Sequence, residues 1–554
     1  MRATSLLPVG LALALAGCGS TRDSLPAEPV ATRPPPMLDG FGALHRDIGT
    51  PVPAAQRYFD QGLRLAYGFN HEAAGRAFAE AARLDPRCAM CAWGQALVLG
   101  PNINLPMDPA LAPEAAALAR RAADLADGAT PADRALIDAL QARYADPAPR
   151  DRKPLDLAYA DAMARAAARF PGDDDAATLH AEALMDVSPW AYWQDDGKPA
   201  AATPTILAEL ERVLARNPHH IGAMHYYIHA TEASPAPRRA EPYADALAAL
   251  APGSGHLVHM PAHTYIRIGR YHDATLTNLS ATTADKAFLA VCRGSNGVYP
   301  IGYVPHNWHF AAMTASLTGS RTLALQAARE TAKRADHAAM GEPPLQFMQL
   351  YVVTPLLTQV RFGDWDAILA QPGAPSGLPF PTAIWHFARG MAHARTGALE
   401  KAAQDADALH ALARDPAMAE VSFFDINHAD GVLRVADALL QGELLRARGQ
   451  PREALARLRE AAAAEDALAY NEPADWPLPA RQYLGTALLE TGDAQAAEQA
   501  FTRALDAYPD NGWSLAGLAL AQQQLGKTDA ARDTQRRQLA AWQWADAPLR
   551  APRY

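Results

Sequence analysis

Histidines gather in the segment NPHHIGAMHYYIHATEASP, residues 217 to 235, of a chain that is otherwise mostly alanine, leucine and arginine. His225 and His229 are one helical turn apart, so both imidazoles would lie on one face of a helix, where two histidines can chelate one metal ion. Glu232 follows on the same segment and would supply a carboxylate. The segment therefore indicates a polar site, either for a metal ion or for an anion or peptide bound without metal.

Further histidines follow downstream, and the full set of candidate metal ligands is His225, His229, Glu232, His256, His259, His263, His306 and His309. Imidazole-rich coordination with one carboxylate suits zinc, copper or iron, and the sequence does not choose among them. If the protein is an enzyme, Glu232 would be its catalytic base, acting on a metal-bound water. If no metal binds, we expect no other cofactor, and the histidines would pack against their surroundings and hydrogen-bond the backbone.

Other catalytic signatures are missing from the sequence. It contains no HExxH motif, no serine nucleophile elbow and no glycine-rich phosphate loop. Any catalysis would therefore depend on the histidines and on Glu232.

The elements that must position these residues are helices. Alanine-rich stretches with apolar residues at spacings of three and four fill the chain between its prolines, while alternating runs of β-branched and aromatic residues are nearly absent. The pattern predicts an all-α protein.

A repeat of 34 residues organises these helices. With Ala55 as position 1, the matching residues are Tyr58 at 4, Gly62 at 8, Leu65 at 11, Ala74 at 20, Phe78 at 24, Ala81 at 27 and Pro86 at 32. Near the C-terminus, Gly485, Leu488, Ala497, Phe501, Ala504 and Pro509 take positions 8, 11, 20, 24, 27 and 32. The chain resembles the tetratricopeptide repeat (TPR) family over most of its length. The resemblance implies a solenoid of helix-turn-helix pairs, elongated and concave on one side.

The repeat register places the histidines on one stripe. Counted back from Pro252 as position 32, His225 and His229 fall at 5 and 9, and His256, His259 and His263 at 2, 5 and 9 of the next repeat. After an insertion, the turn glycine Gly319 sets His306, His309 and Met313 at 2, 5 and 9 of a third repeat. In the TPR family these positions of the first helix line the concave groove. The resemblance therefore implies a histidine-lined groove, with Arg267 and Met313 as further groove residues. Pro261 counts against this register, because a helix starting there would leave His256 and His259 on a loop.

The N-terminus resembles a bacterial lipoprotein signal. Arg2 and the short apolar run LLPVGLALALAG are typical of an export signal. The following Cys18 completes a sequence that resembles a lipobox, which implies a lipid on this cysteine and a membrane attachment through that lipid alone. In a Gram-negative source, the usual lipoprotein sorting pattern with Gly19 in place of aspartate implies the outer membrane, facing the periplasm. The alternative is an ordinary signal peptide in which Cys18 is incidental.

Charge and cysteines bear on the partners. The chain has 50 lysines and arginines against 60 acidic residues, mixed throughout, which argues against a nucleic-acid partner. In an oxidising envelope, Cys88 and Cys91 could form a disulfide.

The organisation that we expect is a signal peptide over residues 1–17, a flexible proline-rich tether over 18–50, an N-terminal TPR region over 51–150, a central histidine-rich region of helical repeats over 151–345 and a C-terminal TPR region over 346–554. Two functions stay open. The preferred one is a lipid-anchored module that binds an envelope protein or peptide in its groove. The other is a metal-binding protein or metal-dependent enzyme that uses the same histidines.

Overall fold

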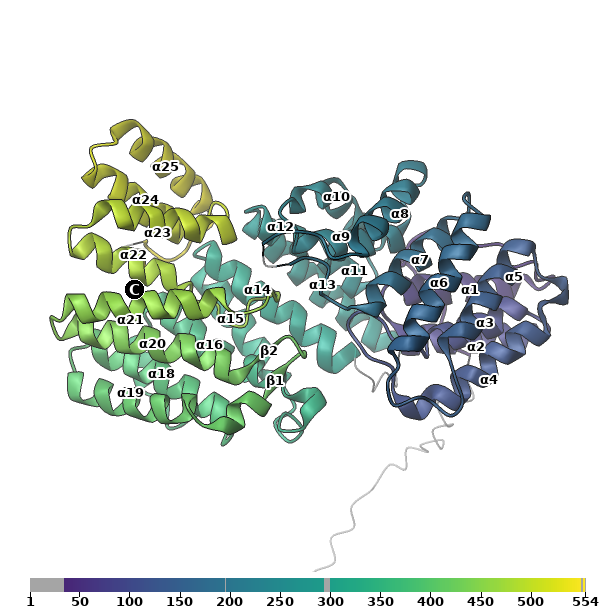
Figure 1. The fold of residues 1–554 in the computed structure, drawn as a ribbon, viewed down its shortest axis with the longest axis horizontal. Helices are drawn as coiled ribbons and strands as arrows, with labels where there is room; N and C mark the ends of the chain where they lie inside the picture. The colour runs from purple at the N-terminus through teal and green to yellow at the C-terminus, as the bar shows by residue number, and fades with distance from the viewer. Residues whose placement is uncertain (1–33, 195, 293–298, 550–551, 554) are drawn as a thin grey trace, which may run out of the picture. The chain divides into compact units, whose positions relative to one another are not determined.

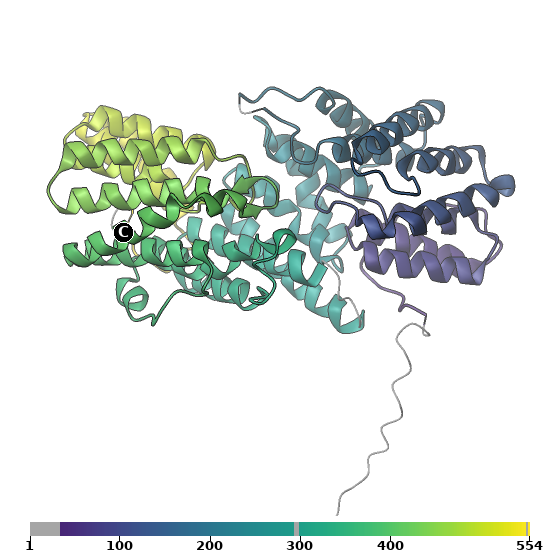
Figure 2. The same cartoon turned by 60° about the horizontal axis from the view of Figure 1, so that its bottom comes forward.

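The computed structural model describes residues 34–194, 196–292, 299–549 and 552–553. The expected signal peptide, Cys18 and the first part of the tether lie outside these residues. Within them, consecutive helices pack against each other as pairs, for example α18 (Pro379–Arg395) with α19 (Leu399–Ala413) and α20 (Ala429–Ala447) with α21 (Pro451–Asp466) (Figures 1 and 2). The predicted all-α fold of helix-turn-helix pairs is confirmed.

The remaining elements follow in chain order. The first helices are α1 (Pro53–Tyr67), α2 (His71–Leu84), α3 (Ala89–Leu97), α4 (Ala112–Asp124), α5 (Pro131–Leu140), α6 (Lys153–Arg169), α7 (Asp174–Val187) and α8 (Thr203–Arg216). Next come α9 (Ile221–Glu232), α10 (Glu241–Leu250), α11 (Gly255–His259), α12 (Pro261–Arg267), α13 (Tyr271–Val291), α14 (Val304–Leu317), α15 (Arg321–Lys333), α16 (Met348–Phe362) and α17 (Trp365–Leu369). The last are α22 (Ala480–Glu490), α23 (Ala494–Ala507), α24 (Gly512–Gln524) and α25 (Thr528–Ala541).

Shorter elements lie between the long helices. Single 3₁₀ turns are η2 (Pro109–Leu111), η3 (Ala126–Gly128), η4 (Gln141–Arg143), η5 (Pro237–Ala240), η7 (Pro343–Leu345) and η8 (Pro416–Glu420), and η6 (Tyr299–Tyr303) is a π turn. The strands β1 (Ser422–Phe423) and β2 (Asn427–His428) pair antiparallel. No helix among the described residues has both the length and the apolar character needed to cross a bilayer.

Phenylalanines explain why the repeat needs glycine where helices cross. Phe78 of α2 is fully buried between Gly62 of α1 and Gly94 of α3. A Cβ atom on either glycine would lie 2.6 Å or 2.5 Å from a carbon of the Phe78 ring, closer than real Cβ atoms approach. Phe501 of α23 lies in the same way against Gly485 and Gly517, where the corresponding distances are 2.6 and 2.2 Å. Glycine at these positions therefore allows the neighbouring helices to approach closely.

Two large apolar clusters form the core. One gathers buried residues from Phe41 to Leu317, and the other gathers residues from Ala335 to Ala521. The first cluster continues across the expected boundary at residue 150. The histidine-rich helices α9, α11, α12 and α14 belong to the last part of this first cluster in chain order.

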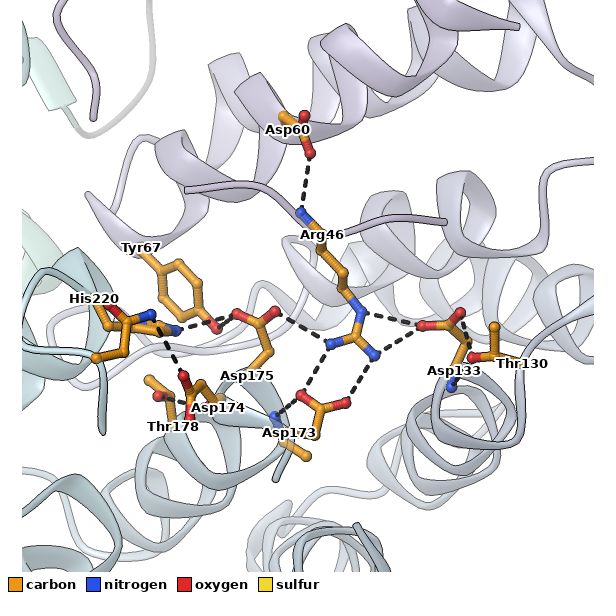
Figure 3. Close-up of polar contacts among 12 residues, drawn as sticks. Arg46, Asp60, Tyr67, Thr130, Asp133, Asp173, Asp174, Asp175, Thr178 and His220 are labelled. Carbon is orange, nitrogen blue, oxygen red and sulfur yellow. Dashed lines mark hydrogen bonds and ion pairs between the residues drawn. The ribbon is translucent and has the colours of Figure 1, made fainter. Parts of the chain in front are cut away.

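The segment before α1 is packed against the helices. Arg46 places its guanidinium among three carboxylates at the starts of two helices, 2.8 Å from Asp133 of α5 and 3.0 and 3.2 Å from Asp173 and Asp175 at α7 (Figure 3). Phe41 is 5% exposed and lies against Phe288. The prediction of a flexible tether up to residue 50 is therefore wrong for residues 35–50. Low apolar content indicated the tether, but a buried ring and a multiply paired arginine are enough to order so short a segment.

The structure joins Cys88 and Cys91 in a disulfide at the start of α3. Among the other described residues, Cys292 is a free and buried thiol.

Candidate metal centre

Four helices bring the histidines together. His225 and His229 lie on α9, His256 and His259 on α11, His263 on α12 and His306 on α14 (Figure 1). The helix α12 does begin at Pro261, but His256 and His259 lie on the short helix α11 and not on a loop. Met260 between the two helices keeps helical angles, φ −49° and ψ −39°, so His259 and His263 retain the spacing of one turn.

Three overlapping groups of side chains have ligand atoms that lie within 4.8 Å of one another. They are His225 with His229 and His256, His259 with His263 and His306, and His229 with Glu232 and His263. All of these side chains are buried except His306, which is half-buried. The structure thus gathers seven of the eight candidate ligands into one connected cluster, which we call the histidine cluster.

The other predicted site residues, His309, Arg267 and Met313, do not belong to the histidine cluster, although the charge of Arg267 opposes the raised pKa of Glu232. The ring of His309 lies 5.4 Å from that of Tyr351 on α16, and His309 belongs to none of the three groups. His309 and Met313 line a cavity whose wall includes Pro473. The guanidinium of Arg267 stacks 5.2 Å above the ring of Tyr470.

Hydrogen bonds fix the orientation of two rings. The Nδ1 atom of His225 lies 2.7 Å from the main-chain oxygen of Tyr67, and the Nδ1 atom of His259 lies 2.7 Å from Oδ1 of Asn278. The amide nitrogen of Asn278 donates to the oxygen of Ala274, so its oxygen faces the ring. Because both partners are acceptors, Nδ1 carries the proton in each ring and Nε2 keeps its lone pair. This is how metal-binding histidines are usually held.

Pairs of ring nitrogens face each other inside the cluster. The two Nε2 atoms of His225 and His256 are 3.0 Å apart, and those of His259 and His263 are 2.8 Å apart. Neither nitrogen of His229 makes a hydrogen bond within the protein, although its Nδ1 lies 3.3 Å from Oε2 of Glu232. A buried polar atom without a partner costs about 1–3 kcal/mol, so such atoms indicate a bound ion, ligand or water.

Two carboxyl groups border the histidines. Oε2 of Glu472, in the segment before α22, lies 2.9 Å from Nδ1 of His263, and Oε2 of Glu232 lies 3.2 Å from the same atom. Burial raises the pKa of Glu232 well above its usual value, and repulsion from Glu472 adds to the shift. Burial also raises the pKa of Glu472 to about 8, against the opposing effect of Arg267. Tyr470 donates a hydrogen bond to Glu472.

Burial keeps the imidazoles neutral. It lowers the pKa of His225 to about 3 and that of His259 to about 4, and it outweighs the opposing hydrogen bonds to Tyr67 and Asn278. The pKa values of His229, His256, His263 and His306 are also lowered, first by burial and then by neighbouring histidines. Neutral imidazole is the form that binds metal ions.

Aromatic rings surround the cluster. The ring of Phe69 lies 4.5 Å from that of His225, and Trp190 meets His229 edge-on at 5.1 Å. Tyr303 lies 4.8 Å from His256, and Phe310 lies 5.2 and 5.0 Å from His259 and His263. These apolar faces exclude water, which strengthens electrostatic interactions inside the cluster.

Sequence reasoning missed three residues that contact the histidines. Glu472 is 209 residues away from His263 in the chain, and Asn278 and Tyr67 carry no local signature of a metal site. The proline-rich stretch around Glu472 marks an irregular segment before a repeat, which is a weak signal for a loop that enters a site.

Comparisons with known proteins concern the architecture. Residues 488–541 match the family described as tetratricopeptide repeat. Among solved structures, the chain is similar to the human IFIT1 dimer with m7Gppp-AAAA, at 12% identity over 89% of this chain and 91% of that one with a TM-score of 0.31. It is also similar to yeast Tom70, at 12% identity over 87% of this chain and 89% of that one with a TM-score of 0.28. A third similar structure is the APC/C hetero-tetramer Cut9–Hcn1, at 13% identity over 88% of this chain and 87% of that one with a TM-score of 0.28.

These similarities do not bear on the histidine cluster. The family match covers the C-terminal repeats alone, and the solved structures are too distant to transfer a ligand or partner to this chain. None of the curated proteins compared with the sequence gives a significant match.

Proposed function

We propose that this chain is a metal-binding protein of helical repeats, whose histidine cluster holds a transition metal. One observation carries the proposal, the approach of Nε2 atoms to 3.0 Å between His225 and His256 and to 2.8 Å between His259 and His263. In each pair at least one of the two nitrogens has no proton, because its ring donates from Nδ1. A cation between such nitrogens satisfies both lone pairs.

A metal-free network of hydrogen bonds is the alternative. The Nε2 atoms of His256 and His263 would then each donate to the facing ring. That arrangement leaves both nitrogens of the buried His229 without a hydrogen bond inside the protein. Metal coordination gives this ring a partner as well, and we prefer it for this reason.

Imidazole ligands favour zinc or copper, with iron next, over the hard cations that prefer oxygen. If the centre is catalytic, Glu232 is the base that we propose for it, since its Oε2 lies within 3.3 Å of Nδ1 of both His229 and His263.

Metal content of the protein produced without an affinity tag tests the proposal. The protein is equilibrated with zinc or copper beside a weak chelator, desalted, and analysed by mass spectrometry of the elements. We expect bound metal in the wild type and a loss of metal in the His225→Ala/His229→Ala double variant. His410→Ala is the matched control, because this ring is half-exposed and pairs with Asp437. Wild-type protein that keeps no metal would remove the proposal.

We propose the cell envelope as the place of this function, with attachment through a lipid on Cys18. The lipobox-like sequence and the disulfide between Cys88 and Cys91 support an oxidising compartment. A Cys18→Ala variant should leave the membrane fraction, and the wild type should carry a lipid on Cys18 in mass spectra. Wild-type protein without lipid would contradict the anchor.

Partner binding is the second function that we propose, with the C-terminal repeats as its surface. Leu520 of α24 is 44% exposed and Leu539 of α25 is 68% exposed, both inside the segment that matches the TPR family. Helical repeats of this kind present extended binding surfaces, and these two leucines give positions at which contact with an envelope protein or peptide can be tested. A photo-crosslinker at residue 539 should capture a partner in the envelope, while one at the exposed Asp506 should not.

A further inference from the structure

We propose that the histidine cluster holds two metal ions, each bound by three histidines. His225, His229 and His256 form the first triad, and His259, His263 and His306 form the second. The inference rests on the proposed metal-binding function and adds the number of ions and the division of the ligands.

The two triads are built alike. Each combines a pair of histidines one turn apart with a third from another helix. In the first triad the pair lies on α9 and the third ring comes from α11. In the second triad the pair spans α11 and α12 and the third ring comes from α14.

One distance in each triad is close to that expected for ligands of a single ion. The nitrogens of two histidines on a tetrahedral ion lie about 3.3 Å apart, because each metal–nitrogen bond is about 2.0 Å long. The structure has one such contact in each triad, at 3.0 Å between His225 and His256 and at 2.8 Å between His259 and His263. Small shifts of the rings would open both to the coordination distance.

One ion cannot bind all six rings in this arrangement. Ligand nitrogens of a single ion lie at most about 4.2 Å apart, twice the metal–nitrogen distance. Among the described residues, no group larger than three satisfies even the wider limit of 4.8 Å, and the one group that crosses between the triads contains only His229 and His263 with Glu232. The six rings therefore divide into two adjacent sites.

In four of the histidines, Nδ1 faces a partner outside the two triads, so that Nε2 points inward. Nδ1 of His225 faces the Tyr67 oxygen and Nδ1 of His259 faces Asn278, while Nδ1 of His229 and of His263 face the carboxyl groups of Glu232 and Glu472. Nε2 is then free to bind metal in all four rings. Such outer contacts from carbonyl and carboxyl oxygens are typical of metal-bound histidine. Glu232 contacts one ring of each triad and so joins the two sites.

Copper is the metal that we infer. The six ligands are all imidazoles, which suit copper and zinc alike, and the carboxyl groups of Glu232 and Glu472 approach Nδ1 atoms and so act as outer partners. The charge of the ions then favours copper. Two cuprous ions bring a charge that these two carboxylates offset when ionised, so that the nearby Arg267 guanidinium remains as the uncompensated cation. Two divalent ions would leave more uncompensated charge in a buried site.

Copper stoichiometry of the full-length protein tests the inference. The protein is loaded anaerobically with cuprous copper beside a competing chelator, and bound copper is measured per chain. We expect two copper ions in the wild type and one in each of the variants His256→Ala and His306→Ala, which remove one ligand from different triads. His306→Gln serves if the alanine variant fails to fold, as judged by circular dichroism.

Each outcome is decisive. One ion in the wild type, lost in both variants, would overturn the two-ion centre and leave the proposed metal binding intact. Loss of both ions from either variant would overturn the division into triads. A wild type that takes two zinc ions but no copper would overturn the choice of metal. No metal at all would overturn the proposed function as well.

Discussion

Asn278 offers a sharp test of the metal centre, because it touches a proposed ligand without being one. Its side chain is fully buried on α13, and its Oδ1 lies 2.7 Å from Nδ1 of His259. Replacing it with alanine removes the acceptor that holds the ring proton on Nδ1. Nothing else in the described structure takes that proton, so His259 loses the orientation that directs Nε2 toward the metal.

The expected effect has two parts. Loss of an outer partner typically lowers metal affinity by about 10- to 100-fold, which corresponds to about 1.4–2.7 kcal/mol. The buried ring nitrogen left without an acceptor destabilises the apo protein by about 1–3 kcal/mol. Asn278→Asp keeps an acceptor at the same place, so it should retain more of the affinity than the alanine variant.

Metal affinity is measured by competition with a chromophoric chelator, and apo stability by urea denaturation. Thr275→Ala is the control, since Thr275 is also buried on α13 and loses a hydrogen bond to Thr314 of 2.9 Å without touching a histidine. It should lose stability but keep its metal affinity. Equal affinities for Asn278→Ala and wild type, with both folded, would refute the assignment of His259 as an Nε2 ligand.

Three further outcomes follow from the fold and the site. Gly94→Ala should lower the free energy of unfolding by about 1–3 kcal/mol, because its Cβ would lie 2.5 Å from the Phe78 ring. Gly128→Ala is the control, since a Cβ there meets nothing within 4 Å, and it should leave the stability unchanged. Equal urea midpoints for the two variants would contradict the packing argument. Burial alone would raise the pKa of Asp175, but the hydrogen bond from His220 and the charge of Arg46 hold it below its usual value. The stabilising contribution of Asp175 is therefore present above pH ~4 and lost as the pH falls. The Asp175→Asn variant should be less stable than wild type at pH 7 and should lose less stability on acidification. Urea titrations at several pH values measure this, and parallel curves of stability against pH for the two proteins would contradict it. Metal at 100 times its dissociation constant should stabilise the fold by about 2.7 kcal/mol, and an unchanged melting temperature would exclude a preference of the metal for the folded state.

Local periodicity made much of the fold predictable from the sequence. The spacing of Gly62 and Phe78, repeated at Gly485 and Phe501, predicts where helices cross, and the structure has those contacts. The turn spacing of His225 and His229 likewise places both rings on one helix face. Such inferences hold because a helix repeats every 3.6 residues whatever surrounds it.

The order of residues 35–50 could not be predicted from their composition, because it depends on contacts with distant parts of the chain. Few apolar residues predicted a tether, but Arg46 finds carboxylates 87, 127 and 129 residues away in the chain. No window of sequence contains both sides of these contacts.

The sequence by itself determined the helical architecture, the close crossings at glycine and the supply of paired histidines. Only the tertiary structure decided that α9, α11, α12 and α14 bring six rings into one cluster, that His309 lies against Tyr351, and that Glu472 approaches His263 from 209 residues away. The physical reason is that ligand geometry depends on distances between helices, which are set by side-chain packing across the whole core and not by the period of any one helix.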